Sequence, residues 1–157
     1  AHAVAQQNIA RNGLSGRMES ICADLRSFTG SGFPVCISNP PYFSGGPASC
    51  TLPTARREDC CTAADLFKAA GKVLKYGGDF YLVHRPERLA ELIARGSEVG
   101  LEAKRLRFLR HREDQVISLI LLQFRKGGKP GLIIEEASLF DKFGNPTSYY
   151  QEVYHIH

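Results

Sequence analysis

The chain has 157 residues, of which 43% are apolar and 23% charged, and its formal net charge is +4. This length suits one domain with a sizeable core, and the composition excludes a disordered or fibrous protein. No apolar stretch is long enough to cross a membrane and no secretory signal opens the chain, so we expect a cytoplasmic protein. The net charge is too small to indicate nucleic acid by itself.

The cysteines argue against both a disulfide framework and a zinc site. There are five of them, an odd number, and none belongs to a Cys-x-x-Cys pair with a matching histidine cluster. Cys22 and Cys36 fall in strand-like runs, where a free thiol behaves as a small apolar side chain. We therefore expect reduced thiols and no metal site.

The first thirty residues predict a helix and then a short strand. Residues 1–11 form the helical stretch, which Asn12 and the glycine after it end. Residues 18–22 alternate as a strand and lead to Asp24 and Leu25. Loops at the carboxyl ends of parallel strands line the ligand crevice of doubly wound folds, so Asp24 is a candidate ligand-binding residue. An ordinary loop or capping carboxylate is the alternative.

A rigid elbow follows the apolar run at residues 35–37, which has the character of a buried parallel strand. The strand stops at Asn39 because the residue before a proline avoids the helical region, and the pair Pro40 and Pro41 cannot extend a strand ladder. The elbow therefore presents the Asn39 amide, the Pro40 carbonyl and the ring of Tyr42 together.

These groups suit the activation of an exocyclic amine. Such an amine is a poor nucleophile because its lone pair is delocalised, and it improves when two acceptors take its hydrogens. The Asn39 side-chain oxygen and the Pro40 carbonyl can be those acceptors, and Tyr42 offers a stacking face for a planar substrate. The alternative is a strand end followed by an ordinary proline turn.

Residues 44–61 show no hydrophobic period and are rich in glycine, proline, serine and threonine. Long loops of this kind in a compact domain are often lids or functional segments. Arg56 lies within this loop and could contact a phosphate, although a solvated charge pair with Arg57 is the simpler interpretation.

Residues 62–75 predict a helix, because Thr62 and Asp65 form a capping pattern and an apolar stripe follows. The glycine pair that begins at Gly77 ends it, and residues 79–83 predict the next strand.

The second predicted strand leads into His84, Arg85 and Pro86, and Pro86 suits the first position of a helix that ends at Gly96. His84 and Arg85 should then lie at the same edge of the sheet as Asn39. A hydrogen-bonded histidine without a chemical role is the alternative for His84, whereas Arg85 is suited to an anion.

Residues 101–109 predict a strand with apolar residues on one face and Arg105 and Arg107 on the other. Such a strand suits a sheet edge, where the arginines either contact phosphate or guard against aggregation. Residues 116–124 are nearly all apolar and predict a central strand, so the two strands should form a terminal hairpin. A short extended run follows at residues 132–134.

The stretch Asn-Pro-Pro-Tyr at residues 39–42 resembles the catalytic motif of S-adenosylmethionine-dependent amino-methyltransferases. Residues 77–89, 101–108 and 126–130 resemble the bacterial tRNA adenine-N6-methyltransferase family, which modifies the adenine beside the anticodon of a valine tRNA. The resemblance covers nearly the whole chain. It implies an α/β, Rossmann-like methyltransferase fold, of which this chain is the C-terminal part with an antiparallel terminal hairpin.

The resemblance also implies roles for individual residues. Asn39, Pro40, Pro41 and Tyr42 would hold the target adenine, which must leave its stack to reach them. S-adenosylmethionine is the implied cofactor and tRNA the implied partner. The implied cofactor-binding residues are Asp24, its neighbour Leu25, and Asn39. The further candidates for contacting the substrate are Phe43, Arg56, His84 and Arg85.

The chain departs from the family at its cofactor site. The family binds the cofactor with a glycine-rich turn after its first strand and an acid after its second, but here Gly30-Ser31-Gly32 precedes a strand. In the family's sheet the two lacking strands lie between those that end at Asp24 and at Asn39, and the chain opens where the helix after the second strand would begin. We therefore expect residues 1–157 to be a partial domain, inactive alone. Glu135 and Glu136 also replace a proline pair of the family.

Four functions remain open at this stage. The elbow chemistry serves methyl transfer to an adenine of tRNA, to a glutamine of a release factor or to the N2 amine of a guanine in ribosomal RNA. The His-Arg-Pro segment and the arginine-rich strand favour tRNA. A noncatalytic RNA-binding module that kept only the base pocket is the alternative from another class.

Overall fold

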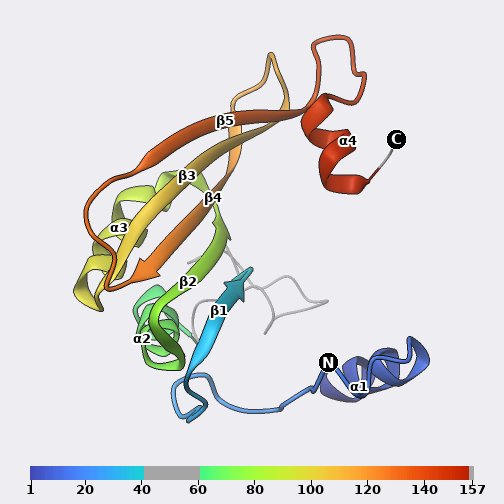
Figure 1. Ribbon diagram of the computed structural model, residues 1–157. Helices are drawn as coiled ribbons and strands as arrows, with labels where there is room; N and C mark the ends of the chain where they lie inside the picture. The colour runs from blue at the N-terminus through green and yellow to red at the C-terminus, as the bar shows by residue number, and fades with distance from the viewer. Residues whose placement is uncertain (41–60, 156–157) are drawn as a thin grey trace, which may run out of the picture.

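The computed structural model describes residues 1–40 and 61–155, which form four α-helices, one short 3-10 helix and five strands (Figure 1). In chain order these are α1 (His2–Arg11), β1 (Phe33–Ser38), α2 (Ala63–Val73), β2 (Leu74–His84), η2 (Pro86–Arg88), α3 (Leu89–Glu98), β3 (Leu101–Arg112), β4 (Ile117–Lys126), β5 (Ile133–Phe140) and α4 (Ser148–Tyr154).

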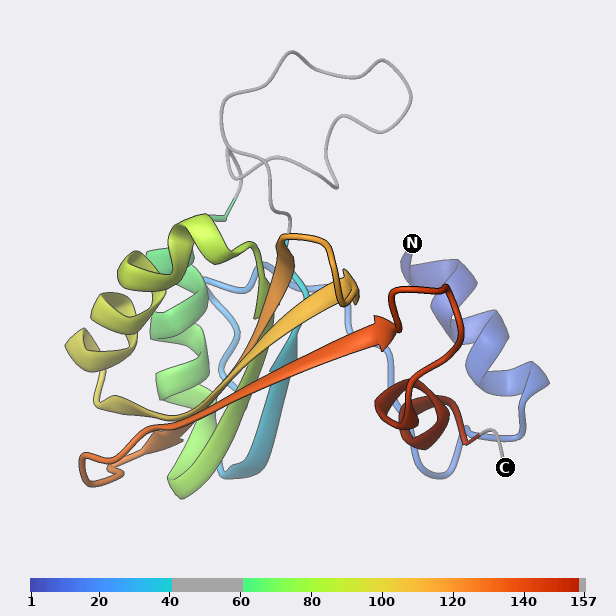
Figure 2. The same cartoon turned by 90° about the horizontal axis from the view of Figure 1, so that it is seen from above.

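The five strands form one mixed sheet in the order β1-β2-β4-β3-β5. β1 runs parallel to β2, β4 runs antiparallel to both β2 and β3, and β5 runs parallel to β3. Helices α2 and α3 cover one face of the sheet, whereas α1 and α4 lie on the other side (Figure 2). The predicted α/β architecture, the central position of β4 and the antiparallel β3–β4 hairpin are confirmed.

The core lies between the sheet and helices α2 and α3. Its centre is an aromatic cluster in which the ring of Phe67 meets Phe80 and Phe124 edge-on, at centroid distances of 5.4 and 5.1 Å. All three rings are fully buried. The predicted cap of α2 is confirmed as well: the Thr62 side chain accepts a hydrogen bond from the backbone N–H of Asp65, and the Asp65 carboxylate accepts one from the backbone N–H of Thr62.

The strand predicted at residues 35–37 forms, but the prediction that it is buried is wrong. β1 is an edge strand with β2 as its single partner in the described sheet, and the side chain of Ile37 is 78% exposed. Cys36 turns toward the core beneath α2. The apolar character of β1 therefore exceeds what its place in this sheet requires.

The predicted strand at residues 18–22 does not form, and those residues have no regular structure. A strand needs a partner to satisfy its backbone groups, and nothing in the described sheet lies alongside this segment. Asp24 consequently follows a loop rather than a strand end.

The arginine-bearing strand β3 is not at the sheet edge, contrary to expectation. It lies between β4 and β5. The edge position belongs to β5, which places Glu135 beside Arg107 and Glu136 near Arg110. The two glutamates that depart from the family pattern thus neutralise arginines of the neighbouring strand.

Two helical features were not anticipated. Gly96, predicted to end a helix, is a buried residue inside α3, which extends to Glu98. Helix α4 follows a turn near the C-terminus, where Thr147 caps it by accepting a hydrogen bond from the backbone N–H of Tyr150. Helix α4 packs on β5 through the contact between its Tyr150 ring and the ring of Phe140.

Candidate functional site

The carboxyl ends of β1 and β2 lie side by side at one edge of the sheet. The two strands are parallel and Ser38 pairs with Leu82, so Asn39 and His84 both emerge at this edge, as predicted. The other elbow and loop candidates lie outside the described residues: Pro41, Tyr42, Phe43 and Arg56.

A small cavity of about 160 Å³ opens beneath the elbow. Pro40 from the elbow, His84 from the end of β2 and Leu25 from the N-terminal segment contribute to its lining. The start of α2 forms its other wall, through residues 61–63 and Leu66. The structure therefore brings together Leu25, Pro40 and His84, which are far apart in the sequence.

His84 is a buried anchor at this edge. Its side chain is 2% exposed, and its Nδ1 accepts a hydrogen bond of 2.8 Å from the backbone N–H of Arg85. A neutral His84 ring therefore carries its proton on Nε2. Glu91 lies nearby, and Arg88 holds the pKa of this carboxylate below its usual range by hydrogen bonding.

Arg85 is half-buried and ties β2 to β4. Its guanidinium donates a hydrogen bond of 3.1 Å to the backbone carbonyl of Ser118, and the Ser118 hydroxyl donates one of 3.1 Å to the carbonyl of Leu109. Part of the guanidinium is therefore used for structure. Its remaining N–H donors are the ones that an anion at this edge would use.

Asp24, the candidate for binding the cofactor's adenine, is exposed and forms an ion pair with Arg26. The Arg26 Nε donates to Oδ1 over 3.0 Å and to Oδ2 over 3.1 Å. These side-chain hydrogen bonds, with a further bond from the backbone N–H of Arg26, lower the pKa of Asp24 to about 2. A ligand amine would have to compete with Arg26 for this carboxylate.

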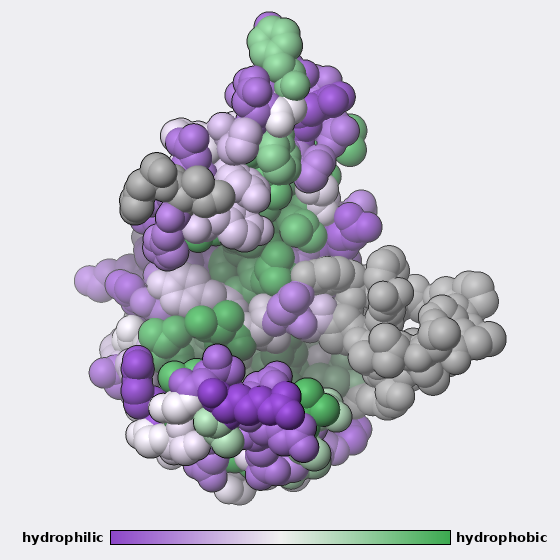
Figure 3. Space-filling view, turned by 90° about the vertical axis from the view of Figure 1, so that its right-hand side faces the viewer, coloured by the Kyte–Doolittle hydropathy of each residue, from purple (hydrophilic) through white to green (hydrophobic). Residues whose placement is uncertain are grey.

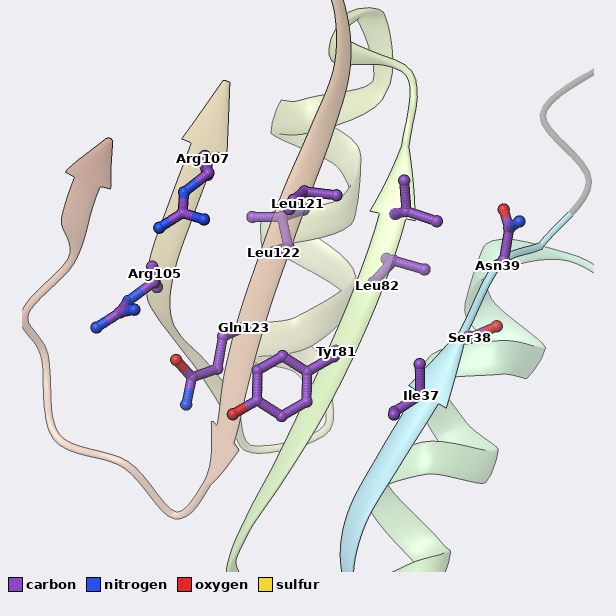
Figure 4. Close-up of a pocket in the computed structure, with 11 residues that line it drawn as sticks. Ile37, Ser38, Asn39, Tyr81, Leu82, Arg105, Arg107, Leu121, Leu122 and Gln123 are labelled. Atoms are coloured by element: carbon purple, nitrogen blue, oxygen red, sulfur yellow. The ribbon is translucent and has the colours of Figure 1, made fainter. Parts of the chain in front are cut away.

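A larger cavity, of about 350 Å³, lies on the sheet face away from α2 and α3 (Figure 4). Asn39 stands at one end, at the close of β1, and Arg105 and Arg107 project from β3 at the other. Tyr81 and Gln123 lie between them on neighbouring strands. The floor between these groups is apolar, with Ile37, Val83 and Leu121 among its residues.

Tyr81 and Gln123 were not singled out from the sequence. The signal that could have found them is the period-two alternation of their strands, which turns Tyr81 and Gln123 away from the buried Phe80, Leu82, Leu122 and Phe124. Their place beside Arg105 depends on the register of β2, β4 and β3, which alternation alone does not give.

The arrangement joins acceptor groups at a strand end to a flat apolar surface with donors beyond it. An exposed asparagine next to a proline carbonyl can accept two hydrogens from one amine, and an apolar floor with a tyrosine ring suits a planar molecule. Within residues 1–40 and 61–155, no three His, Cys, Asp or Glu side chains are close enough to hold a metal ion. Among the described helices, none is long and apolar enough to span a membrane.

Comparisons by sequence identify no relatives: no family model matches the chain, and no curated protein matches it. Comparisons by structure find solved proteins of similar fold. A predicted O-methyltransferase, protein Atu636 from Agrobacterium tumefaciens, aligns with a TM-score of 0.76 at 18% identity, over 97% of this chain and 71% of that chain.

A second solved structure, provisionally described as the modification subunit of a type I restriction enzyme from Vibrio vulnificus YJ016, aligns with a TM-score of 0.55 at 17% identity. The alignment covers 97% of this chain and 37% of the Vibrio vulnificus chain. At such identities the likeness concerns the fold. The chain has the mixed α/β, Rossmann-like fold that these proteins share.

Proposed function

We propose that this chain carries the target-amine pocket of an S-adenosylmethionine-dependent methyltransferase that acts on the N6 amine of an adenine in tRNA. The observation that carries the proposal is the position of Asn39 and Pro40. They follow a parallel strand, at the edge where its neighbour β2 also ends, and this edge is where α/β folds bind ligands.

The fold and the names of the similar structures support methyl transfer. Those structures are described as a predicted O-methyltransferase and as a modification subunit of a type I restriction enzyme. The choice of an amine rests on the Asn-Pro-Pro-Tyr stretch, and the choice of tRNA rests on its resemblance together with the segment that begins at His84.

In this proposal the chain positions the amine and holds its two hydrogens. The side-chain oxygen of Asn39 and the carbonyl oxygen of Pro40 each accept one hydrogen, which turns the nitrogen lone pair outward. When bound, S-adenosylmethionine supplies the methyl carbon, whose bond to sulfur breaks as its bond to the amine nitrogen forms. The amine can lose its proton late, so no base with a shifted pKa is required at the elbow.

The described residues fit the cofactor in part. Asp24 offers a carboxylate acceptor for an adenine amine once Arg26 releases it, and Leu25 lies in the small cavity beside Pro40. In the described part of the chain, no glycine-rich turn joins a strand to a following helix. The remaining contacts would come from elsewhere, so we also propose that residues 1–157 are part of a larger methyltransferase domain. The position of β1 at the edge of the described sheet, with β2 as its one partner there, supports this view.

Transfer of labelled methyl from S-adenosylmethionine tests the function. This chain and the longest polypeptide that its gene encodes would each be offered unmodified tRNA, ribosomal RNA and a release factor. We expect the longer polypeptide to label tRNA on adenine N6 and this chain alone to be much weaker. Label on the release factor or on guanine would move the assignment to another amine.

Substitutions at Asn39 test the mechanism in the longer polypeptide. Asn39→Ala removes one of the two acceptors and should lower the rate on the order of 10²- to 10³-fold. Asn39→Asp keeps an acceptor oxygen at the same place and should retain part of the activity. Asn12→Ala, at the exposed end of α1, is the matched control and should leave the rate unchanged. Equal rates for Asn39→Ala and the control would contradict the role of the elbow.

A further inference from the structure

An exposed aromatic ring stands on the turn between β5 and α4. Phe143 is 78% exposed, and Gly144 at the next position has a φ of 90°, which a glycine adopts without strain. This turn projects at the top of the molecule in Figure 1, and the space-filling view shows an apolar group at the top with hydrophilic groups on either side (Figure 3). The ring therefore meets solvent at a tip of the molecule.

Several hydrogen bonds hold this turn in one conformation. The Asp141 carboxylate accepts hydrogen bonds from the backbone N–H of Phe143 over 2.8 Å and from the backbone N–H and side-chain amide of Asn145, each over 2.9 Å. The backbone N–H of Asp141 donates to the Asn145 carbonyl over 2.9 Å. A β-bridge between Phe140 and Pro146 closes the base of the turn. A ring on so constrained a turn loses little conformational freedom when it binds a ligand.

A cation lies beside the ring. The ammonium of Lys142 lies 5.0 Å from the centroid of the Phe143 ring, which is a cation–π contact. Among the described residues no carboxylate forms an ion pair with Lys142, and the neighbouring Asp141 uses both of its carboxylate oxygens within the turn. A flat apolar ring beside an ammonium offers a stacking surface to a base and a partner to a phosphate.

The turn lies on the same edge of the sheet as the elbow. β5 runs parallel to β3, and both β3 and β2 run antiparallel to β4, so β1, β2, β3 and β5 all end at this edge. Asn39 follows β1 at one side of the sheet, and Phe143 follows β5 at the other. Four inter-strand spacings, about 19 Å, separate these two strands. A few nucleotides of single-stranded RNA can cross this distance, so one segment can reach both residues.

We propose that Phe143 stacks on an unpaired nucleotide of the substrate RNA, a few positions from the base that the elbow holds, and that Lys142 contacts a phosphate of this segment. Proteins that read RNA by sequence bind single-stranded loops, whose unstacked bases lie against aromatic side chains. A protein partner would fit this turn poorly, because protein interfaces centre on a contiguous apolar patch and the chain neighbours of Phe143 are a lysine and a glycine. The inference rests on the proposed function, which supplies the substrate RNA.

Binding of an RNA stem-loop tests the stacking. The unmodified anticodon stem-loop of a valine tRNA would be titrated with the longest polypeptide that the gene encodes, without S-adenosylmethionine. Phe143→Ala should raise the Kd about 5- to 150-fold, the range for loss of one base–aromatic stack, whereas Phe143→Trp should keep the affinity. Tyr76→Ala is the matched control, because Tyr76 is 79% exposed at the opposite end of β2, and it should leave the Kd unchanged.

Two further measurements separate stacking from charge. Lys142→Ala should weaken binding and lower the slope of log affinity against log salt by about one, as loss of one phosphate contact requires. A blunt duplex of the stem sequence offers no unpaired base, so Phe143→Ala should not change its Kd.

A stem-loop Kd unchanged by Phe143→Ala, an equal loss in Tyr76→Ala, or no binding by the unaltered polypeptide would overturn the inference. Methyl transfer to tRNA is measured separately. Binding that depends on Phe143 without methyl transfer would remove the proposed function and keep the stacking. Methyl transfer with a Kd that does not respond to Phe143→Ala would remove only the stacking.

Discussion

Asp24 and Arg26 show how a local interaction occupies a residue that a ligand would need. Both side chains are exposed, yet several hydrogen bonds join them within three residues of chain. This pairing stabilises the ionised carboxylate, and the stabilisation is lost as the pH falls from the ordinary aspartate range toward the lowered pKa. In a cofactor-bound state, Arg26 would have to turn away.

The pairing predicts the titration of Asp24. In the native chain its pKa should be about 2, because the Arg26 side chain donates hydrogen bonds to it. Arg26→Gln should raise this pKa toward the ordinary value for aspartate, which carboxyl NMR shifts can follow. Asp141, whose pKa is lowered by Asn145, serves as the control and should not respond. An unchanged Asp24 pKa in the variant would show that Arg26 does not hold it.

At the scale of elements, Gly96 has a packing role in α3. A Cβ atom at Gly96 would lie 2.7 Å from the ring of Phe124 and 2.9 Å from the carbonyl oxygen of Leu101. The glycine thus lets α3 approach β4 and β3 closely. From the sequence, a glycine near the end of an apolar stripe indicates a helix stop equally well, because the sequence does not show what lies opposite.

Replacing two helical glycines by alanine should change the free energy of unfolding in opposite directions. Gly96→Ala should destabilise the protein by about 1–3 kcal/mol, because a close-packed ring and a backbone carbonyl must move. Gly71→Ala in α2 should stabilise it by about 0.4–1 kcal/mol, since its Cβ would lie 3.4 Å from Val99, an ordinary contact. Urea denaturation of both variants measures the difference. A gain of stability in Gly96→Ala would contradict the described packing.

The sequence predicted elements best where local signals agree. Thr62 with Asp65 correctly marked the start of α2, and Pro86 correctly marked a helical start, because caps and prolines act within a few residues. The alternation at residues 18–22 predicted a strand that does not form. Alternation indicates side chains that suit a sheet surface, but it does not show whether a neighbouring strand is present to pair with. The edge position of β5 was missed for the same reason.

At the scale of the whole molecule, stability depends on the aromatic cluster beneath the sheet. Phe67→Ala should cost about 3–5 kcal/mol of unfolding free energy, because it removes a fully buried ring that contacts Phe80 and Phe124. Phe143→Ala removes a ring that is 78% exposed and should change stability by at most about 0.5 kcal/mol. Similar unfolding midpoints for the two variants would contradict this account of the core.

The part of the candidate site that lies at the carboxyl ends of strands was predictable from the sequence. The elbow at Asn39 and the position of His84 at the same edge both follow from strands that end in recognisable sequences. The surface that joins Asn39 to Arg105 was not predictable, because it depends on the register of four strands. Within residues 1–40 and 61–155, β5 supplies carboxylates to Arg107 and Arg110 but none to Arg105, which the sequence alone does not reveal.

The most direct test of the central claim is nucleoside analysis of tRNA from a strain without the gene. The account predicts that N6-methyladenosine disappears from one tRNA, returns with the intact gene and does not return with an Asn39→Ala copy expressed at the same level. An unchanged content of N6-methyladenosine in the deletion strain, or full restoration by Asn39→Ala, would contradict the assignment of the elbow to an adenine of tRNA.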